Sequence, residues 1–367
     1  MPVATPLFDT EAQLREVRAE VDAAIARVVE SGRFILGPEV EAFEHEFAEY
    51  LGVRHVVGVA NGTDAITIAL RCLGVGPGDD VVVPSFTFYA SAEAIPHTGA
   101  RPVFCDVDPE TFCVTPEIVE RALTPATRAV IAVDLFGRVA PVDRLREQLA
   151  GRGIAVLEDA AQAAGARLGG RRAGSLGDVG TFSFFPSKNL FCLGDGGALA
   201  TDDDAIAEQA RILRFHGSRD KSTFAEVGWN SRLDALQAAV LRAVLTRLDG
   251  WNERRRALAA AYAEAGIGDV VALPEAAEGE EPVHHLFVTR ADDPDALAAR
   301  LADAGVASRS YYRVPVHRQP AMAPWPPDGD LPGTERAAHT NLALPMGPTL
   351  GPAAATAVAN TLSTAHR

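Results

Sequence analysis

The sequence predicts an α/β fold in which a mostly parallel sheet of about seven strands is covered by helices on both faces. Between residues 53 and 201, short apolar runs rich in β-branched residues alternate with amphipathic segments. Continuous apolar runs of this length are typical of strands buried on both faces of a parallel sheet. Seven such runs occur, at 55–60, 81–84, 101–107, 129–134, 154–159, 180–185 and 197–201.

Polar capping residues mark the places where helices follow these strands. Thr63 and Asp64 stand between the first run and an apolar-periodic segment, and Thr115 precedes Pro116 at a second helix start. Side-chain oxygens at such positions accept hydrogen bonds from the first helical turn, and proline fits its first position. Because ligands of open α/β sheets bind beyond the carboxyl ends of the strands, residues that end strands are the first candidates for function.

The pattern changes after Asn230. An Ala/Leu/Arg-rich helical stretch, which Gly250 can interrupt, is followed by an acidic loop at 276–282, a strand-like run at 284–290 and a helix near 294–304. We expect the acidic loop to be a solvated surface turn. The sequence therefore predicts a large domain, residues 1–245, with an N-terminal helical segment, and a smaller C-terminal α+β domain, residues 246–367.

Charge and composition narrow the class of function. The 367 residues carry a net charge of −15, which argues against nucleic acid as a partner because phosphate binding needs a basic surface. The four cysteines form no C-x-x-C pair and no cluster with histidine, so we expect neither disulfides nor a metal site. With no secretory leader and no apolar run near the roughly 20 residues of a bilayer span, we expect a cytoplasmic protein without membrane association.

Lysine is scarce in this chain. Of the 34 basic residues, only Lys188 and Lys221 are lysines. Arginine supplies positive charge elsewhere, so position 188 is a candidate for what only a lysine amine does, which is to lose its proton and attack a carbonyl. The alternative is that a composition bias left two lysines by chance.

An aspartate completes a recognisable pair with this lysine. Asp159 ends the run 154–159, about thirty residues before Lys188, and Ser183 lies between them. A pyridoxal phosphate site requires such a pair, because the lysine forms a Schiff base with the cofactor and the carboxylate keeps the pyridine nitrogen protonated. A helix N-cap is the alternative role for Asp159.

The phosphate of that cofactor needs local donors in an acidic protein. Asn61, Gly62 and Thr63 lie between a strand and a helix start, where they offer backbone N–H groups, a hydroxyl and the positive end of a helix. Ser183 offers a second hydroxyl. An ordinary turn and cap would use the same residues. Neither a G-x-G-x-x-G nor a P-loop pattern occurs, so dinucleotide and P-loop sites lose their main support.

These residues lie in segments that resemble the pyridoxal-phosphate-dependent nucleotide-sugar aminotransferases of the DegT/StrS family. The resemblance covers nearly the whole chain. It implies the fold of the fold-type I aminotransferases and a homodimer whose active sites are shared between subunits. It rests on segments 61–70, 81–95, 101–112, 156–166, 181–203, 214–218, 228–241 and 311–322.

The resemblance also implies roles for individual residues. Lys188 is implied as the Schiff-base lysine and proton carrier, and Asp159 as the partner of the pyridinium. The remaining cofactor residues are implied as Gln162 and Phe88 at the ring, Gly62, Thr63 and Ser183 at the phosphate, and Asn230 from the neighbouring subunit. His216, Lys221, Tyr312 and His317 are implied as substrate residues, for each of which a surface or packing role is an equal alternative.

The reaction implied is transamination of a nucleotide-linked keto-deoxysugar, with L-glutamate as the amino donor, in amino-sugar biosynthesis for a natural product or a surface polysaccharide. Relatives that dehydrate the sugar carry histidine in place of this lysine, so Lys188 favours amination. We expect a dTDP-linked keto-6-deoxyhexose, aminated at C3 or C4. The alternatives are a cyclitol aminotransferase or sugar dehydratase of the same fold, and a non-catalytic regulatory protein.

Overall fold

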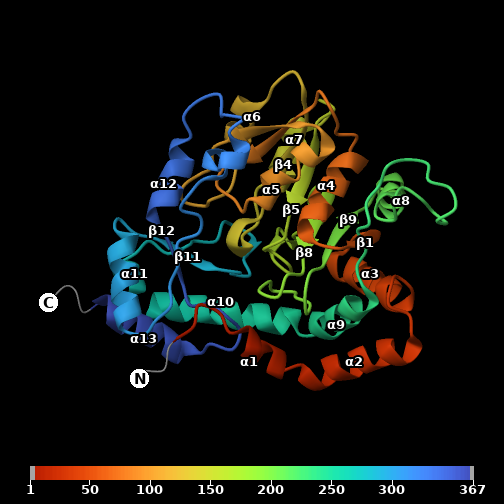
Figure 1. Ribbon diagram of the computed structural model, residues 1–367. Coiled ribbons are helices and arrows are strands. Elements are labelled where there is room, and N and C mark those ends of the chain that lie inside the picture. The colour runs from red at the N-terminus through yellow and green to blue at the C-terminus, as the bar shows by residue number, and fades with distance from the viewer. Residues whose placement is uncertain (1–4, 364–367) are drawn as a thin grey trace.

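The computed structural model describes residues 5–363 and confirms the predicted α/β architecture (Figure 1). Seven strands form one sheet in the order β1-β9-β8-β5-β4-β2-β3, in which only β9 runs antiparallel to its neighbours. Every apolar run expected to be a strand is one. The strands are β1 (His55–Val59), β2 (Asp80–Pro84), β3 (Arg101–Cys105), β4 (Thr127–Val133), β5 (Ala155–Asp159), β8 (Val179–Ser183) and β9 (Gly197–Thr201).

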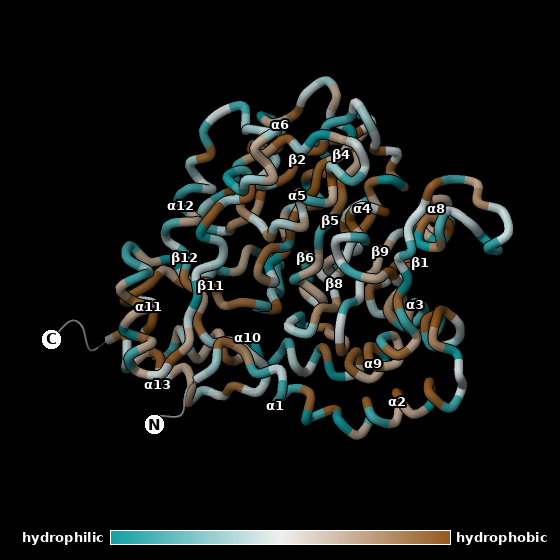
Figure 2. The backbone as a smooth tube through the Cα atoms, viewed as in Figure 1, coloured by the Kyte–Doolittle hydropathy of each residue, from teal (hydrophilic) through white to brown (hydrophobic). Residues whose placement is uncertain are grey.

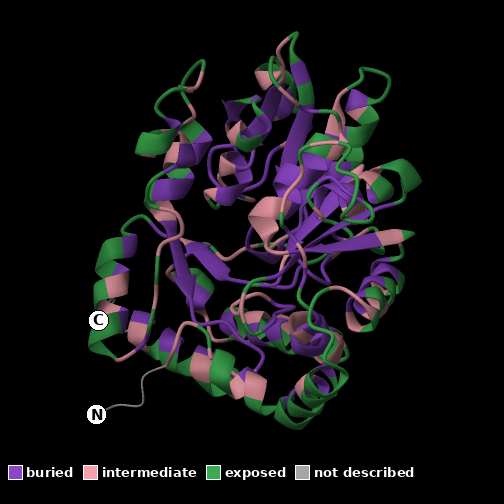
Figure 3. Cartoon of the chain, turned by 45° about the vertical axis from the view of Figure 1, so that its right-hand side comes forward, coloured by how far each residue is buried: buried purple, intermediate pink, exposed green. Residues whose placement is uncertain are grey.

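Helices cover both faces of the sheet. Neighbouring strand residues such as Val56 and Val57 belong to two different core clusters, because side chains along a strand point alternately to opposite faces. Figure 3 shows the strands almost wholly buried between the helical layers. One layer consists of α4 (Gly62–Cys72), α5 (Ala90–Glu93) and α8 (Asp204–Leu213), and the other of α3 (Pro38–Leu51), α6 (Pro116–Ala122), α7 (Val142–Leu149) and α9 (Ala235–Leu245).

The N-terminal helices add an outer layer. After α1 (Thr10–Arg15) comes α2 (Arg18–Ser31), along which hydrophobic and hydrophilic residues alternate in bands (Figure 2). Its buried residues Val21, Ala24 and Val28 recur at three- and four-residue spacing, so they share one helix face. That face packs on α9, where Ala24 and Val28 cluster with two buried alanines.

The C-terminal part of the chain has an apolar core of its own. Tyr262 and Phe287 stack within it, with ring centroids 4.8 Å apart. Ala337 of α12 (Pro332–Thr340) packs instead in the core of the large sheet, and the domain boundary between residues 245 and 246 stays a prediction. The elements that build the C-terminal core are α10 (Leu248–Glu264), α11 (Pro294–Asp303), α13 (Pro352–Ser363) and the antiparallel strands β11 (Phe287–Arg290) and β12 (Asn341–Leu344).

The expectation that Gly250 interrupts the helical stretch is wrong, and the expectation of a solvated acidic loop holds for residues 276–279 and 281 but not for Glu280 and Pro282. The helical stretch breaks at residues 246–247, and Gly250 lies inside α10. The acidic loop is not simply solvated, because Glu280 is buried and its carboxylate accepts hydrogen bonds from the Arg138 guanidinium at 3.0 Å and the Val139 N–H at 2.9 Å. A buried guanidinium requires such a counter-ion. Glu280 belongs to β10 (Glu280–Glu281), which joins β6 (Arg167–Leu168) and β7 (Arg171–Arg172) in a small sheet.

Among residues 5–363, no helix combines the length and the apolar character that crossing a bilayer requires. Nor does the same range contain a group of three or more His, Cys, Asp or Glu side chains arranged to hold a metal ion.

Two buried carboxyl groups connect the ends of β4 and β5. Asp134 Oδ1 accepts a hydrogen bond from the Ala140 N–H, and Glu158 Oε2 accepts from the N–H groups of Leu176 and Gly177. With both groups ionised, the remaining oxygens Oδ2 and Oε1 would have no hydrogen-bond partner. Burial, followed by the charge of Glu158, raises the pKa of Asp134 well above its usual range. Asp134 therefore keeps a proton and shares it with Glu158.

We expect Asp134→Asn to stabilise the protein at neutral pH. A carboxyl group whose pKa is raised by folding contributes its full stability at low pH and loses it as the pH rises above its unfolded pKa of about 4. The amide of the variant donates to Glu158 without that loss. Urea unfolding should show a gain on the order of 1 kcal/mol at pH 7.5 that shrinks towards pH 4. Asp134→Leu, which cannot donate, should be less stable than the parent, and a destabilised Asp134→Asn would contradict the shared proton.

Candidate active site

One pocket, at the carboxyl ends of the parallel strands, gathers most of the predicted site residues. Its volume is about 1120 Å³. Asp159 comes from the end of β5, Ser183 from the end of β8, and Lys188 from the loop that follows β8. The predicted residues that line it are Gly62, Thr63, Phe88, Asp159, Gln162, Ser183, Lys188 and Tyr312.

The pKa of the Lys188 amine lies closer to neutral pH than that of an ordinary lysine. The backbone N–H of Lys188 donates to the Phe185 carbonyl at 2.8 Å, which closes a tight turn around the side chain. Burial lowers the pKa of Lys188 to about 8, against the opposing effect of the Asp159 charge. An amine with such a pKa exchanges protons readily near neutral pH, which a general acid and base requires.

Asp159 is a buried carboxylate with neutral hydrogen-bond partners. Its Oδ2 accepts from the Ser91 hydroxyl at 2.7 Å, and its Oδ1 accepts from the Ala161 N–H at 3.2 Å. Burial raises the pKa of Asp159, while these hydrogen bonds and the Lys188 charge act in the opposite direction. A buried negative charge of this kind gains from a cationic ligand such as a protonated pyridine nitrogen.

The start of α4 and the end of β8 form a cradle suited to an anion. Asn61 caps α4, and its Oδ1 accepts from the Asp64 N–H at 2.8 Å. Gly62 and Thr63 occupy the first turn, where backbone N–H groups and the helix dipole favour negative charge. A Cβ on Gly62 would lie only 2.8 Å from the Cβ of Ser183, so glycine permits this close approach. Together these groups fit a phosphate.

Aromatic and amide groups complete the wall of the pocket. The Gln162 Oε1 accepts from the Phe136 N–H at 2.8 Å, and its Nε2 donates to the Tyr312 hydroxyl at 3.2 Å. The rings of Tyr312 and Phe88 lie 6.1 Å apart. Phe88 is 51% exposed, so it offers an aromatic surface on which a planar ring can stack.

The other predicted residues do not line this pocket. Asn230, His216 and Lys221 are exposed and lie in the segment 214–234 between α8 and α9, part of which projects beside α8 in Figure 1. Asn230 pairs with Phe215 through a β-bridge, and the Lys221 ammonium lies 5.0 Å from the centroid of the same ring. Within the chain, these three residues therefore lie outside the pocket that contains Lys188.

His317 is also outside the pocket. It lies in the 3-10 turn Val316–Arg318, where its Nδ1 is 2.5 Å from the Ser85 hydroxyl and its Nε2 is 3.7 Å from Glu335. These contacts tie the turn to the residue that follows β2. A packing role is therefore enough to explain the position of His317.

Several pocket residues were not expected from the sequence, among them Ser91, His285 and Arg309. Ser91 donates to Asp159, His285 lies buried in the wall, and the Arg309 guanidinium is 5.0 Å from the centroid of the Tyr311 ring. Each comes from a segment that reaches the pocket through tertiary packing. The only local signal was the paired histidine at 284–285, polar residues directly before an apolar strand.

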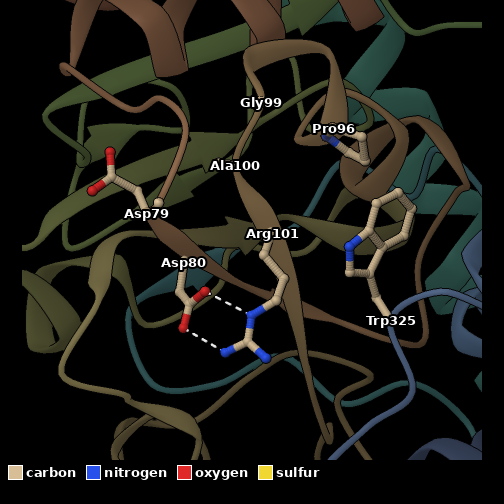
Figure 4. Close-up of a pocket in the computed structure, with 8 residues that line it drawn as sticks. Asp79, Asp80, Pro96, Gly99, Ala100, Arg101 and Trp325 are labelled. Carbon is tan, nitrogen blue, oxygen red and sulfur yellow. Dashed lines mark hydrogen bonds and ion pairs between the residues drawn. The ribbon is translucent and has the colours of Figure 1, made fainter.

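A second, smaller pocket lies at the amino ends of β2 and β3 (Figure 4). Asp80 and Arg101, the first residues of β2 and β3, form a two-pronged ion pair there with distances of 2.8 and 2.7 Å. The hydrogen bond from Arg101 lowers the pKa of Asp80 and keeps its carboxylate ionised. Because each charge satisfies the other, the pocket around Lys188 is the better candidate for catalysis.

Comparisons with known proteins agree with this site. A family model described as the DegT/DnrJ/EryC1/StrS aminotransferase family matches residues 15–363. The dTDP-3-amino-3,4,6-trideoxy-α-D-glucose transaminase of Streptomyces venezuelae is 50% identical over 347 residues, covering 94% of this chain and 92% of that protein. A pleiotropic regulatory protein of Geobacillus stearothermophilus is 43% identical over 349 residues, covering 94% of each.

A comparison with solved structures agrees with these sequence comparisons. The structure of DesV from S. venezuelae, solved in complex with a ketimine intermediate, superposes on this chain with a TM-score of 0.94. The two are 48% identical, and the match covers 99% of this chain and 98% of that one.

We expect the Lys188 amine, when it is not bonded to a cofactor, to have a pKa of about 8, against about 10.4 for an unperturbed lysine. Reductive methylation with ¹³C-formaldehyde labels amines, and in a Lys221→Arg background Lys188 is the one labelled side chain. Its methyl resonance can then be followed by NMR. Asp159→Asn should lower this pKa further, because the Asp159 charge raises it. A midpoint above pH 9.5 would show that the amine is not desolvated.

Proposed function

This chain belongs to the DegT/DnrJ/EryC1/StrS aminotransferase family, and from that premise we propose that it aminates the C3 keto group of a dTDP-linked 6-deoxyhexose, with L-glutamate as donor. The chain is a sugar aminotransferase that uses pyridoxal phosphate. The relative at 50% identity, a dTDP-3-amino-3,4,6-trideoxy-α-D-glucose transaminase, supports the nucleotide and the position. The observation that carries the catalytic proposal is the joining of Lys188 and Asp159 in one pocket.

The donor groups of the pocket fit pyridoxal phosphate. When bound, this cofactor supplies an aldehyde that links to amines and a ring that withdraws electrons from the carbon beside them. In the proposed arrangement, Lys188 provides the protein's amine and Asp159 holds a proton on the ring nitrogen. Phe88 and Gln162 then orient the ring. The phosphate is assigned to Gly62, Thr63 and Ser183.

Proton movement is assigned to Lys188. Its neutral Nζ would accept a proton from the α-carbon of the amino donor, and the resulting ammonium would deliver that proton to the aldehyde-derived carbon of the cofactor in the same half of the reaction. With the keto-sugar, the transfer would run in the opposite direction. A pKa of about 8 serves both directions near neutral pH. Arg309, at the rim of the same pocket, offers a cation for the diphosphate of the sugar nucleotide.

We propose that the active form is a homodimer whose pockets are shared. Phe34, Ile35 and Leu193 are exposed apolar residues gathered around the start of α9, and Val227 in the projecting segment 214–234 is 91% exposed. Apolar surfaces of this kind mark interfaces, and a two-fold interface uses the same patch on both copies. Asn230 would then reach the phosphate of the partner's pocket, since it lies outside its own.

A cytoplasmic location is proposed because all four cysteines are free. A regulatory protein without catalysis is the second candidate function, since one relative is named a pleiotropic regulatory protein. Retention of Lys188 and Asp159 in one pocket favours the enzyme, because regulation alone requires neither.

Turnover of a defined sugar tests the main proposal. Incubation with pyridoxal phosphate, L-glutamate and a panel of dTDP- and UDP-linked keto-sugars should yield an amine at C3 of a dTDP-6-deoxyhexose, located by NMR. Lys188→Arg keeps the charge but removes the titrating amine, so it should lower the rate by about 10³-fold or more. A protein that binds the cofactor yet aminates no member of the panel would reject the sugar assignment, and one that never binds it would favour regulation.

Shared pockets predict complementation between two inactive variants. Lys188→Ala removes the amine from its own pocket, and Asn230→Ala removes a phosphate ligand from the partner's pocket. Mixed dimers contain one pocket with both residues, so random subunit exchange should restore about a quarter of the parent activity. Each variant alone is the control. Activity no higher than the sum of the two would place Asn230 outside the partner's site.

A further inference from the structure

The residues before β11 are fixed to the loop that carries the catalytic amine. The carbonyl of Val283 accepts a hydrogen bond from the Asn189 side chain at 3.1 Å, and the same Nδ2 donates to Asn252 at 2.8 Å. Asn189 directly follows Lys188 and is buried. The segment 283–286 is therefore tied to the residue that follows Lys188.

The turn Leu135–Gly137 supports this segment from the other side. The carbonyl of Gly137 accepts from the Val283 N–H at 2.8 Å, and the carbonyl of Phe136 accepts from the Leu286 N–H at 3.4 Å. Gly137 has a φ of +94°, and a Cβ there would lie 2.6 Å from the backbone nitrogen of His285. Only glycine allows this approach, and it fixes the backbone of His285 at the pocket wall.

His285 is a buried imidazole with an unsatisfied nitrogen. It lines the pocket together with Lys188, is 8% exposed, and its Nδ1 has no hydrogen-bond partner among the described residues. Burial lowers the pKa of His285 well below its usual value, and the charges of Lys188 and Arg255 act in the same direction. The ring is therefore neutral, with one nitrogen free to accept a hydrogen bond. A buried nitrogen left unpaired in an active site calls for a partner.

We propose that His285 positions the catalytic lysine: its neutral Nδ1, which is unpaired in the structure, accepts a hydrogen bond from the Lys188 Nζ once that amine has been released from the cofactor and has taken up a proton. The inference rests on the proposed function only in requiring that Lys188 be released during turnover. Nε2 then carries the ring proton. The bond favours the ammonium form and restricts a long side chain to one position, so the released amine stays in line for its next proton transfer.

Other titratable groups also lie near His285 and Lys188. The Asp159 charge stabilises the Lys188 ammonium. Arg255 donates to the His284 carbonyl at 3.2 Å, and burial lowers the pKa of His284 to about 4, so that neighbouring ring is also neutral at pH 7. Nδ1 of His285 thus remains the neutral acceptor available on this side of Lys188.

Two substitutions separate hydrogen bonding from packing. His285→Asn places an amide oxygen near the position of Nδ1, whereas His285→Leu fills the space without an acceptor. Both are made in the full chain with Lys221→Arg, labelled with ¹³C-methyl groups, and titrated before and after addition of pyridoxamine phosphate. We expect the Lys188 pKa to fall by about one unit in the leucine variant and to stay within about 0.3 units in the asparagine variant. The half-reaction with L-glutamate should slow about 10-fold in the leucine variant alone.

The outcomes decide the proposal. An unchanged Lys188 pKa in His285→Leu, or an equal shift in both variants, would overturn it, the latter by reducing His285 to a packing role. If the leucine variant fails to fold, His285→Gln replaces it, because its amide lies nearer the position of Nε2 and should lower the pKa in the same way. The titration uses no sugar, so failure to aminate nucleotide sugars would reject the proposed function and leave this result intact.

Discussion

Burial of negative charge at the ends of β4 and β5 is the constraint on which the site depends. Asp159 faces the pocket, and Asp134 and Glu158 lie beside it on the two paired strands. Three carboxylates so close together and away from water would repel one another strongly. The protein resolves the problem with a proton between Asp134 and Glu158 and with a hydroxyl and a lysine near Asp159. One negative charge is left facing the pocket, where a cationic ring nitrogen would meet it.

The same desolvation sets the properties of the amine. Lys188 sits where burial destabilises its ammonium and Asp159 partly restores it, so its pKa reflects the balance of the two. The surrounding contacts hold that balance in place, from the buried amide of Asn189 to the glycine turn that supports residues 283–286. Geometry and proton affinity at Lys188 therefore have a common origin in tight packing around the loop after β8.

The strands and the Lys188 and Asp159 pair could be predicted because their signals are local. A strand buried on both faces must be apolar throughout, and a lysine in an arginine-rich chain is conspicuous. Glu280 could not be placed, since its burial depends on Arg138, far away in the sequence. Ser91 and His285 were missed for a similar reason, as their roles come from neighbours brought by the fold. Asn230 was named only through the resemblance, and it lies outside the pocket of its own chain.

The scarcity of lysine has a chemical consequence beyond catalysis. Pyridoxal phosphate is an aldehyde that condenses with any accessible amine, whereas a guanidinium is too weak a nucleophile to compete. Because arginine provides all the other basic side chains apart from histidine, Lys221 is the one side-chain amine besides Lys188 that can condense with the cofactor. The colour that develops on reconstitution should therefore count occupied sites almost directly, with little background from the surface.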